Sequence, residues 1–394
     1  MLTANDRTEP ENALHCSLWT AEHVALIASN NLPETAIIDA DQAQAIVPHL
    51  TLWDIWPVQY DDGSVAQVAG GSLWMILSAP RRDDPNQRHD EARIRLLHQI
   101  DGQWRDCGNL LPDGFAPGSR EWSGSARLDP QSNIVTLWFT AAGRNGAVKH
   151  DFEQRLFHAT GSLSLSGAHP AVTNWQGLAQ SVINDGSHYA DLAVNQGVPG
   201  HIKGFRDPYW FRDPADGKGY ILFTGSKSAA VSLSDFDGVI GIAASADNDG
   251  CGAVPYILLP AIVDGDGVAN EMERPHVFVH GGLYYLFWSS QAQIFSPDVT
   301  PCPTGLYGMV APNLFGPYEP LNSSGLVLAN PAIEPRQAYA WQVLPSLDIV
   351  SFVDYWGMHG REEGEASSQF GGTIAPIIKI ELNGSATRIV GGAP

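Results

Sequence analysis

The sequence predicts an all-β fold, a five-bladed β-propeller with a central channel. Two observations carry this prediction: a composition rich in turn residues, and a pair of strand-like segments that recurs five times. Gly and Pro account for 40 and 27 of the 394 residues, and only 16% of residues are charged. Such a chain lacks the long charged faces of surface helices, so short strands joined by turns are favoured.

One half of the repeat is a short apolar run rich in β-forming residues. These runs lie at 72–79, 134–142, 219–226, 283–290 and 348–355. Taking Leu77, Phe139, Phe223, Phe287 and Phe352 as equivalent points, the spacings are 62, 84, 64 and 65 residues. Runs of this composition, bounded by Gly, Asp and Asn, are typical of β-strands.

The other half is a segment in which polar groups stand among aromatic residues, starting 10 to 20 residues before each run. These segments are 52–59, 121–128, 205–211, 273–279 and 338–345. Radial repetition of small antiparallel sheets fits such units, and the first strand of each blade would then line the channel. A β-sandwich or a mixed α+β protein with strands of similar composition is the alternative.

The whole chain, 1–394, is predicted to form one propeller domain, because no Ser- or Pro-rich linker divides it. Residues 1–50 are expected to be a helical and irregular segment packed on the propeller. Within this segment, 18–30 is predicted to be a short amphipathic helix. Its apolar side would consist of Trp19, Val24, Leu26 and Ile27.

Charge and targeting features argue against several partners. Lys and Arg number 22 against 43 Asp and Glu, a net charge of −21. Such a surface repels phosphate backbones and anionic lipids, so we expect no nucleic acid and no membrane partner. The N-terminus has no basic segment followed by an apolar run, so no cleavable signal peptide is expected.

The cysteines favour neither a zinc site nor a dense disulfide framework. They lie far apart and form no CxxC pair, and we expect isolated buried thiols. The four are Cys16, Cys107, Cys251 and Cys302.

Three inner segments each carry a carboxylate beside aromatic or cationic neighbours. Asp54 stands in Trp-Asp-Ile-Trp-Pro, Asp207 in Phe-Arg-Asp-Pro, and Glu273 in Glu-Met-Glu-Arg-Pro. Carboxylates inside strands are disfavoured, so three at equivalent blade positions indicate a function. Retaining glycoside cleavage would use one as nucleophile and one as proton donor, and its transition state gains from further negative charge.

The surrounding residues suit a sugar. Arg206 offers a fixed fork of donors for hydroxyl groups. Flat apolar faces for a sugar ring are offered by Trp53, Trp56 and Trp122. Taken singly, each carboxylate also has a structural interpretation, as a turn cap for Asp54 or as an ion pair with a neighbouring Arg for the other two.

Arg-Asp-Pro occurs twice, at 206–208 and 212–214, and only one copy can face the channel. The second copy is followed by Ala-Asp-Gly-Lys-Gly, a hairpin signal, which predicts a turn role for Asp213. Asp207, which precedes a strand-like Tyr-Trp-Phe, is therefore the copy that we assign to the channel.

Four ordered motifs, spread over most of the chain, resemble those of glycoside hydrolase family 68. They are LWDIWPVQ at 52–59, EWSGSA at 121–126, FRDP at 205–208 and NEMERP at 270–275. That family contains levansucrases, inulosucrases and β-fructofuranosidases, which act on sucrose with retention on a five-bladed propeller. The resemblance therefore implies sucrose and fructo-oligosaccharides as partners and no cofactor.

The resemblance also implies roles for individual residues. Asp54 would be the nucleophile that forms a fructosyl-enzyme, Asp207 the transition-state stabiliser and Glu273 the general acid/base. The implied substrate contacts are Trp53, Trp122, Ser123 and Arg206 in the fructosyl pocket, with Glu271 and Tyr339 near the acid/base and the glucosyl unit. Glu271 would share a face with Glu273 in an extended segment, where its charge would help to hold the pKa of the acid high.

The sequence departs from the family after Phe287. Levansucrases similar to this chain usually place His or Arg where a gap-free reading puts Gln291, a position associated with the acceptor sugar. This change puts long-chain polymer synthesis in doubt. Gram-positive relatives have a calcium site, but no matching cluster is found here, and no metal is assigned.

Two other interpretations of the same residues remain open. An inverting pentosidase on a similar propeller would use the second carboxylate as a base on water, with a wider separation of the two carboxylates. A non-catalytic propeller would bind sugars without cleaving them. For location we expect either an extracellular protein exported without a cleaved signal or a cytoplasmic one.

Overall fold

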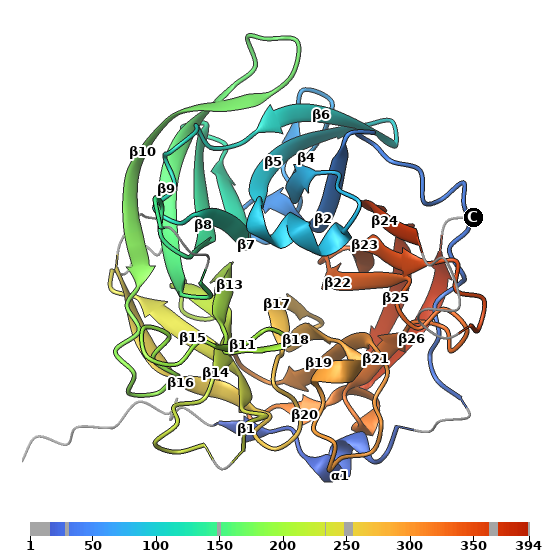
Figure 1. Ribbon diagram of the computed structural model, residues 1–394. Helices are drawn as coiled ribbons and strands as arrows, with labels where there is room; N and C mark the ends of the chain where they lie inside the picture. Colours follow the sequence, from blue (N-terminus) through green and yellow to red (C-terminus); the bar gives the residue numbers. More distant parts are fainter. Residues whose placement is uncertain are drawn as a thin grey trace, which may run out of the picture.

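Five groups of mainly antiparallel strands stand around a central channel in the computed structural model, and Figure 1 looks along this channel; short parallel pairings of β2 with β7 and of β10 with β16 join the first three groups. The structure describes residues 16–27, 31–147, 151–232, 234–247, 255–361 and 369–392. Each group is one blade of a five-bladed β-propeller, so the predicted fold class is confirmed. The innermost strands of the blades are β2, β7, β13, β17 and β22.

The first three blades follow one another along the chain. Blade one consists of β2 (Leu50–Gln59), β3 (Gln67–Val68), β4 (Gly71–Pro80), β5 (Arg93–Ile100) and β6 (Gln103–Asn109). Blade two consists of β7 (Arg120–Asp129), β8 (Ile134–Ala142), β9 (Gln154–Ser164) and β10 (Ala171–Val182). Blade three consists of β13 (Phe205–Arg212), β14 (Gly219–Ser226), β15 (Gly238–Ser245) and β16 (Tyr256–Asp264).

The last two blades complete the ring. Blade four consists of β17 (Glu273–His280), β18 (Leu283–Ser290), β19 (Gly305–Ala311), β20 (Glu319–Pro320) and β21 (Leu326–Ala329). Blade five consists of β22 (Ala338–Val343), β23 (Asp348–Trp356), β24 (Gln369–Ile374), β25 (Ile378–Asn383) and β26 (Ala386–Gly392). The small elements are β1 (Ser17–Leu18), α1 (Ala21–Val24), β11 (Gly197–Val198), β12 (His201–Ile202), and the 3-10 helices η1 (Pro85–Asp90), η2 (Ala292–Ile294) and η3 (Leu321–Ser323).

All ten predicted segments are strands. The polar-aromatic segments form the five innermost strands, and the apolar runs form the strands paired with them. The predicted end at residue 345 is wrong by two residues, because β22 ends at Val343. Apolar side chains fill the space between blades; Trp138 of β8 and Trp210 of β13, for example, are fully buried and stack at 5.3 Å.

The predicted N-terminal helix is largely absent. The described part of 18–30 holds only one helical turn, α1, preceded by strand β1, which pairs with β16 of blade three. Trp19, Val24 and Ile27 are buried as expected, but Leu26 is 60% exposed. Tertiary contacts outweigh helix periodicity here, since the Trp19 indole donates to the carbonyl oxygen of Ser324 at 2.9 Å.

The rest of the N-terminal segment runs along blades four and five. Thr35 N donates to Ala329 O, and the Gln337 side-chain amide donates to Ala36 O at 2.7 Å. Of the three cysteines that the structure describes, only Cys302 is a buried free thiol, because Cys16 is exposed and Cys107 is half-buried. Cys251 lies outside the described residues.

Candidate active site

A cavity of about 140 Å³ opens into the channel, and the innermost strands supply most of its wall. Two rings of residues, one residue apart in sequence, line it. The first ring is Trp53, Trp122, Arg206, Glu273 and Tyr339, and the second is Asp54, Ser123, Asp207, Arg274 and Ala340. Each blade contributes one member to each ring, so the fivefold repeat builds the site.

A β-bulge in every innermost strand explains why two consecutive side chains both face the channel. Along β2, Trp53 pairs with Leu77 and Trp56 with Met75, so three steps on β2 match two on β4. The other four inner strands shift register at the corresponding place. A bulge breaks the alternation of side chains, which in a regular strand would send one of each pair away from the channel.

The second ring also has an unusual backbone. Asp54, Asp207, Arg274 and Ala340 have φ values of 51°, 60°, 51° and 56°. Left-handed conformations of residues other than Gly cost about 1–3 kcal/mol each and are found mainly at functional sites. The strain therefore marks the ring as a place where side-chain direction matters more than local stability.

The bulges correct one expectation. Asp54 and Asp207 occupy equivalent blade positions, but Glu273 lies one residue earlier, and Arg274 holds the equivalent position in blade four. Glu273 thus corresponds to Trp53 and Arg206 rather than to the two aspartates. The sequence motifs could not reveal this offset, because the extra residue of a bulge depends on cross-strand register.

Asp54, on β2 of blade one, interacts with Ser123 of blade two and Arg274 of blade four. Ser123 Oγ donates a hydrogen bond to Asp54 Oδ2 at 2.6 Å. Burial raises the pKa of the Asp54 carboxyl, whereas Arg274 and the Ser123 hydroxyl oppose that rise. Arg274 itself is fixed by hydrogen bonds to Ile55 O at 2.7 Å and Ala340 O at 2.9 Å.

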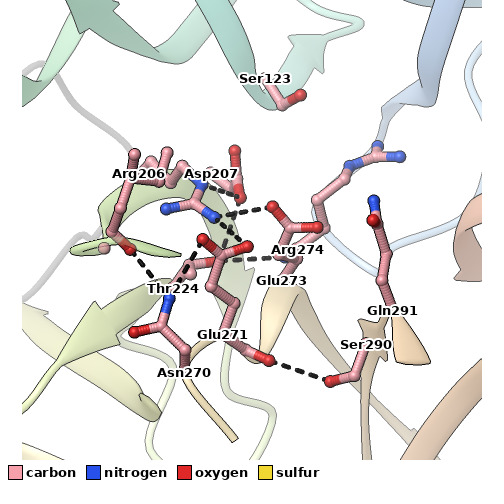
Figure 2. Close-up of polar contacts among 12 residues, drawn as sticks. Ser123, Arg206, Asp207, Thr224, Asn270, Glu271, Glu273, Arg274, Ser290 and Gln291 are labelled. Carbon is pink, nitrogen blue, oxygen red and sulfur yellow. Dashed lines mark hydrogen bonds and ion pairs between the residues drawn. The ribbon is translucent and has the colours of Figure 1, made fainter. Parts of the chain in front are cut away.

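Arg206 is the electrostatic centre of the cavity, and Figure 2 shows its guanidinium between three carboxylates. Its Nη2 lies 2.7 Å from Glu273 Oε1 and 3.1 Å from Glu271 Oε2, and its Nε lies 3.6 Å from Asp207 Oδ2. Burial lowers the pKa of Arg206, but these carboxylates outweigh burial and hold it above the usual value. Arg206 Nη1 has no partner among the described residues.

Glu273 and Glu271 lie on the same side, as the extended spacing predicted, and share Arg206 Nη2. The Tyr339 hydroxyl donates to Glu273 Oε2. Burial raises the pKa of Glu271 to about 8 against the opposing charge of Arg206. Glu271 does not belong to the cavity wall itself, and Ser290 Oγ fixes it by donating to its carbonyl oxygen at 2.9 Å, as Figure 2 shows.

Asp207 is held by two threonines of neighbouring strands. Thr224 Oγ1 donates to Asp207 Oδ2 at 3.0 Å, and Asp207 N donates to Thr140 Oγ1 at 2.9 Å. Burial raises the pKa of Asp207 to about 7, with Arg206 opposing the rise. Asp207 held in this way lines the cavity wall.

The second Arg-Asp-Pro copy lies away from the cavity. Asp213 Oδ1 accepts from Ala215 N at 2.9 Å, an Asx turn, and from the Tyr284 hydroxyl at 2.5 Å. Its backbone closes the turn through Gly217 N. The structure therefore bears out the assignment of a turn role to Asp213 and of the channel to the other copy.

Trp56 is not a sugar-binding face, in contrast to the expectation. Its side chain is fully buried beyond the bulge, where the Arg274 guanidinium lies 5.9 Å from its ring. Trp53 and Trp122 do line the cavity, and so does the half-buried Gln291. Other wall residues were not found by the sequence reasoning: Leu77, Arg88, His89, Ile202, Arg274, Ala340, Phe352 and Asp354.

The described part of the chain holds no group of three or more His, Cys, Asp or Glu side chains that could bind a metal ion. In the same ranges, no helix is long and apolar enough to span a membrane. The cavity instead combines ionisable carboxylates, a fixed guanidinium and two indole rings, which suits polyhydroxylated substrates and carboxylate chemistry.

Comparisons with known proteins agree with this geometry. The sequence matches the family described as Levansucrase/Invertase over residues 9–238 and 227–391. It is 33% identical to a levansucrase of Zymomonas mobilis, over 93% of this chain and 89% of the relative. An extracellular sucrase of the same organism is 32% identical over 86% of this chain and 84% of its own.

A solved structure is also similar. The inulosucrase of Halalkalicoccus jeotgali bound to kestose superposes with a TM-score of 0.87 at 35% identity, covering 96% of both chains. The family match extends over nearly the whole propeller and includes every blade that contributes to the cavity. This chain therefore belongs to the levansucrase/invertase family, glycoside hydrolase family 68.

Proposed function

We propose that this protein cleaves sucrose by a retaining double displacement through a fructosyl-enzyme. Asp54 attacks the anomeric carbon of the fructosyl unit, the bond to the glucosyl oxygen breaks, and Glu273 gives its proton to that oxygen. Water or a sugar hydroxyl then attacks the same carbon. Glu273 takes the proton of the incoming group, and the bond to Asp54 breaks.

The surroundings of Asp54 support its role as nucleophile. Arg274 and the Ser123 hydrogen bond favour the ionised carboxylate despite burial. Glu273 has a different environment, with Arg206 on one oxygen and the Tyr339 hydroxyl on the other. Tyr339 can donate to the carboxylate form and so stabilise Glu273 after it has lost its proton.

Asp207 and Arg206 suit the stabilisation of the transition state. Asp207 lies in the same ring as Asp54, and its ionised form adds negative charge where an oxocarbenium-like centre develops. Arg206 Nη1, buried and without a partner among the described residues, is free to bind a sugar hydroxyl. The indole faces of Trp53 and Trp122 complete the pocket for the fructosyl ring.

One observation carries the proposal: the bulged inner strands bring Asp54, Asp207 and Glu273 into one small cavity. Neither an inverting pentosidase nor a non-catalytic sugar-binding propeller is favoured by the family to which the chain belongs. Sucrose and short fructo-oligosaccharides are the proposed substrates and products, supported by the kestose complex of the related inulosucrase.

The test is the reaction of the purified protein with sucrose in water containing methanol. Retention predicts glucose release together with methyl β-fructofuranoside, and rapid acid quenching should yield protein heavier by one fructosyl unit, with the label on Asp54. A methyl α-fructofuranoside as first product would indicate inversion. Sucrose binding without release of glucose would indicate a non-catalytic propeller.

We further propose that the protein acts outside the cell, supported by the similarity to an extracellular sucrase. Sucrose-cleaving activity should then appear in the culture medium of cells that produce the protein, without release of a cytoplasmic marker enzyme. Activity that is absent from the medium and appears only after washed cells are lysed would contradict this location.

A further inference from the structure

Two charged residues in the cavity wall have no part in the mechanism above. Arg88 comes from η1, which Figure 1 shows as a short blue coil on the inner side of blade one, and Asp354 comes from β23 of blade five. Both line the cavity, with exposed fractions of 8% and 7%. Buried charges are costly unless they are paired or used to bind something.

Neither charge is fully satisfied by the protein. Arg88 Nε and Asp354 Oδ1 are buried and have no hydrogen-bond partner among the described residues. Arg88 Nη1 donates to Pro85 O at 2.8 Å, which fixes the guanidinium without using its Nε. Together with Arg206 Nη1, the cavity wall thus holds several buried polar atoms without a partner, which a ligand with hydroxyl groups would satisfy.

Packing contacts and a β-bulge fix the positions of Arg88 and Asp354. The Arg88 guanidinium stacks on the Phe370 ring of β24 at 4.4 Å and lies 5.8 Å from the Trp53 ring, so it reaches from blade one to blade five. Asp354 lies opposite a bulge in β24, between the pairs Val353–Thr373 and Tyr355–Phe370. Such a bulge re-aims the residues beside it.

Two glycines make this bulge possible. A Cβ at Gly371 would lie 2.4 Å from Val353 Cγ1, and Gly372 has a φ of 59°. Larger residues would push β24 away from β23 and would turn the Phe370 ring, which supports Arg88, out of place.

We propose that Arg88 and Asp354 are specificity-determining residues that hold one hydroxyl group of the bound fructosyl unit between them. The inference rests on the proposed function, and it assigns a hydroxyl-binding role to the side of the pocket that blades one and five form. The hydroxyl donates to Asp354 Oδ1 and accepts from Arg88 Nε, which satisfies both orphan atoms at once.

Both charges line the same small cavity as Asp54, which points to the fructosyl unit as the part that they contact. Burial raises the pKa of Asp354 to about 6, where Arg88 and Arg336 oppose the rise and Asp54 adds to it, and Arg88 also opposes the rise that burial causes in the pKa of Asp54. Asp54 must touch the anomeric carbon of the fructosyl ring, so groups that interact with it flank the same ring. Trp53, which the Arg88 guanidinium approaches, directly precedes Asp54 in β2.

The test uses Asp354→Asn, which preserves shape, and Arg88→Met, which keeps the unbranched stem. Each is assayed on sucrose and on a set of sucrose analogues that each lack one fructosyl hydroxyl. We expect kcat/KM for sucrose to fall about tenfold to a hundredfold, because a charge-assisted hydrogen bond is lost. One analogue should be an exception, and it should be the same for both variants. On this analogue the kcat/KM of each variant should lie within about twofold of the wild-type value, because the analogue lacks the hydroxyl that makes the hydrogen bond.

Matched controls lie on the same elements or close to them. Asp348→Asn is on the same strand but pairs with Lys379 at the surface, and Arg82→Met pairs with the exposed Glu91. Both should leave kcat/KM unchanged on every substrate. Thermal unfolding of each variant separates folding defects, and Arg88→Lys replaces Arg88→Met if the latter does not fold.

The outcomes distinguish the two proposals. Loss of kcat/KM by the same factor on sucrose and on every analogue would overturn the inference, since Asp354 would then act without touching a hydroxyl. Unchanged kinetics would overturn it as well, and so would the selection of different analogues by the two variants. A wild-type protein that releases no glucose from sucrose would instead overturn the proposed function.

Discussion

Ser123 Oγ lies 2.6 Å from Asp54 Oδ2, a hydrogen bond that joins the inner strand of blade two to that of blade one. The two residues belong to the same ring of the cavity but to motifs 69 residues apart. The hydroxyl donates to the ionised carboxylate and opposes the effect of burial on its pKa. This hydrogen bond, together with burial and Arg274, therefore sets the pH at which the proposed nucleophile becomes available.

Ser123→Ala is expected to shift the acidic limb of the pH profile of kcat/KM to higher pH. A hydrogen bond to the charged form lowers a carboxyl pKa, so its removal raises the pKa of Asp54, and activity is then lost at higher pH as acid is added. The measurement is initial-rate glucose release from sucrose across the acidic range. Ser125→Ala is the control, because Ser125 bonds Pro208 O outside the cavity and should leave the limb in place.

Asp54→Asn and Glu273→Gln are each expected to lower kcat on sucrose by several orders of magnitude while the fold persists. Each change removes a covalent or proton-transfer role and keeps the shape of the side chain. Circular dichroism checks the fold, and glucose release measures the rate. Glu273→Gln should recover most of its rate of first-step cleavage on a fructosyl donor whose leaving group needs no proton. A variant that retains most of its turnover on sucrose would not belong in the mechanism.

Asp207→Asn is expected to be severe and Asp213→Asn mild, although the two residues share the motif Arg-Asp-Pro and are both buried. Asp207 faces the cavity, whereas Asp213 holds a turn and the Tyr284 hydroxyl, contacts that an Asn oxygen can still accept. Comparison of kcat/KM for the two variants decides the matter. The opposite order would place the stabilising carboxylate in the second copy.

The strands of this fold could be predicted from the sequence, whereas the β-bulges that shape the site could not. Apolar runs such as 283–290 and the polar-aromatic segments predicted every inner strand, because composition and length are local properties. The offset of Glu273 and the burial of Trp56 were missed, since both follow from a bulge that cross-strand register creates. Arg88 and Asp354 were missed because their position depends on the closure of the ring between the first and last blades.

Glu271→Gln is expected to raise the melting temperature at neutral and mildly alkaline pH. The folded-state pKa of Glu271 is about 8, above that of an unfolded chain, so the folded protein holds an extra proton between those values and loses stability as pH rises through that window. Gln mimics the protonated form and avoids the loss. The gain in Tm over the wild type should therefore grow from about pH 4.5 to about pH 8. A gain that shrinks over this range would mean that Glu271 is ionised in the folded protein.

Gln291 decides the last prediction, which concerns the fate of the fructosyl-enzyme. Gln291 lines the cavity at the start of η2, where an acceptor sugar would approach the anomeric carbon, and the Gln293 side chain donates to its amide oxygen. An acceptor must be positioned against water at roughly 55 M, and positioning alone is worth several kcal/mol. Hydrogen bonds from charged groups contribute about 1.5–3 kcal/mol against about 1 for neutral ones. A neutral amide in place of a cation therefore shifts the partition of the fructosyl-enzyme toward water by about tenfold.

We expect mainly hydrolysis and short fructo-oligosaccharides from the unmodified protein, and a higher transfer fraction from Gln291→His and Gln291→Arg, measured by chromatography of the products from concentrated sucrose. Gln103→His, at an exposed position on strand β6 away from the cavity, should leave the ratio unchanged. Abundant ethanol-precipitable fructan from the unmodified protein, or an unchanged ratio in both Gln291 variants, would show that other residues hold the acceptor.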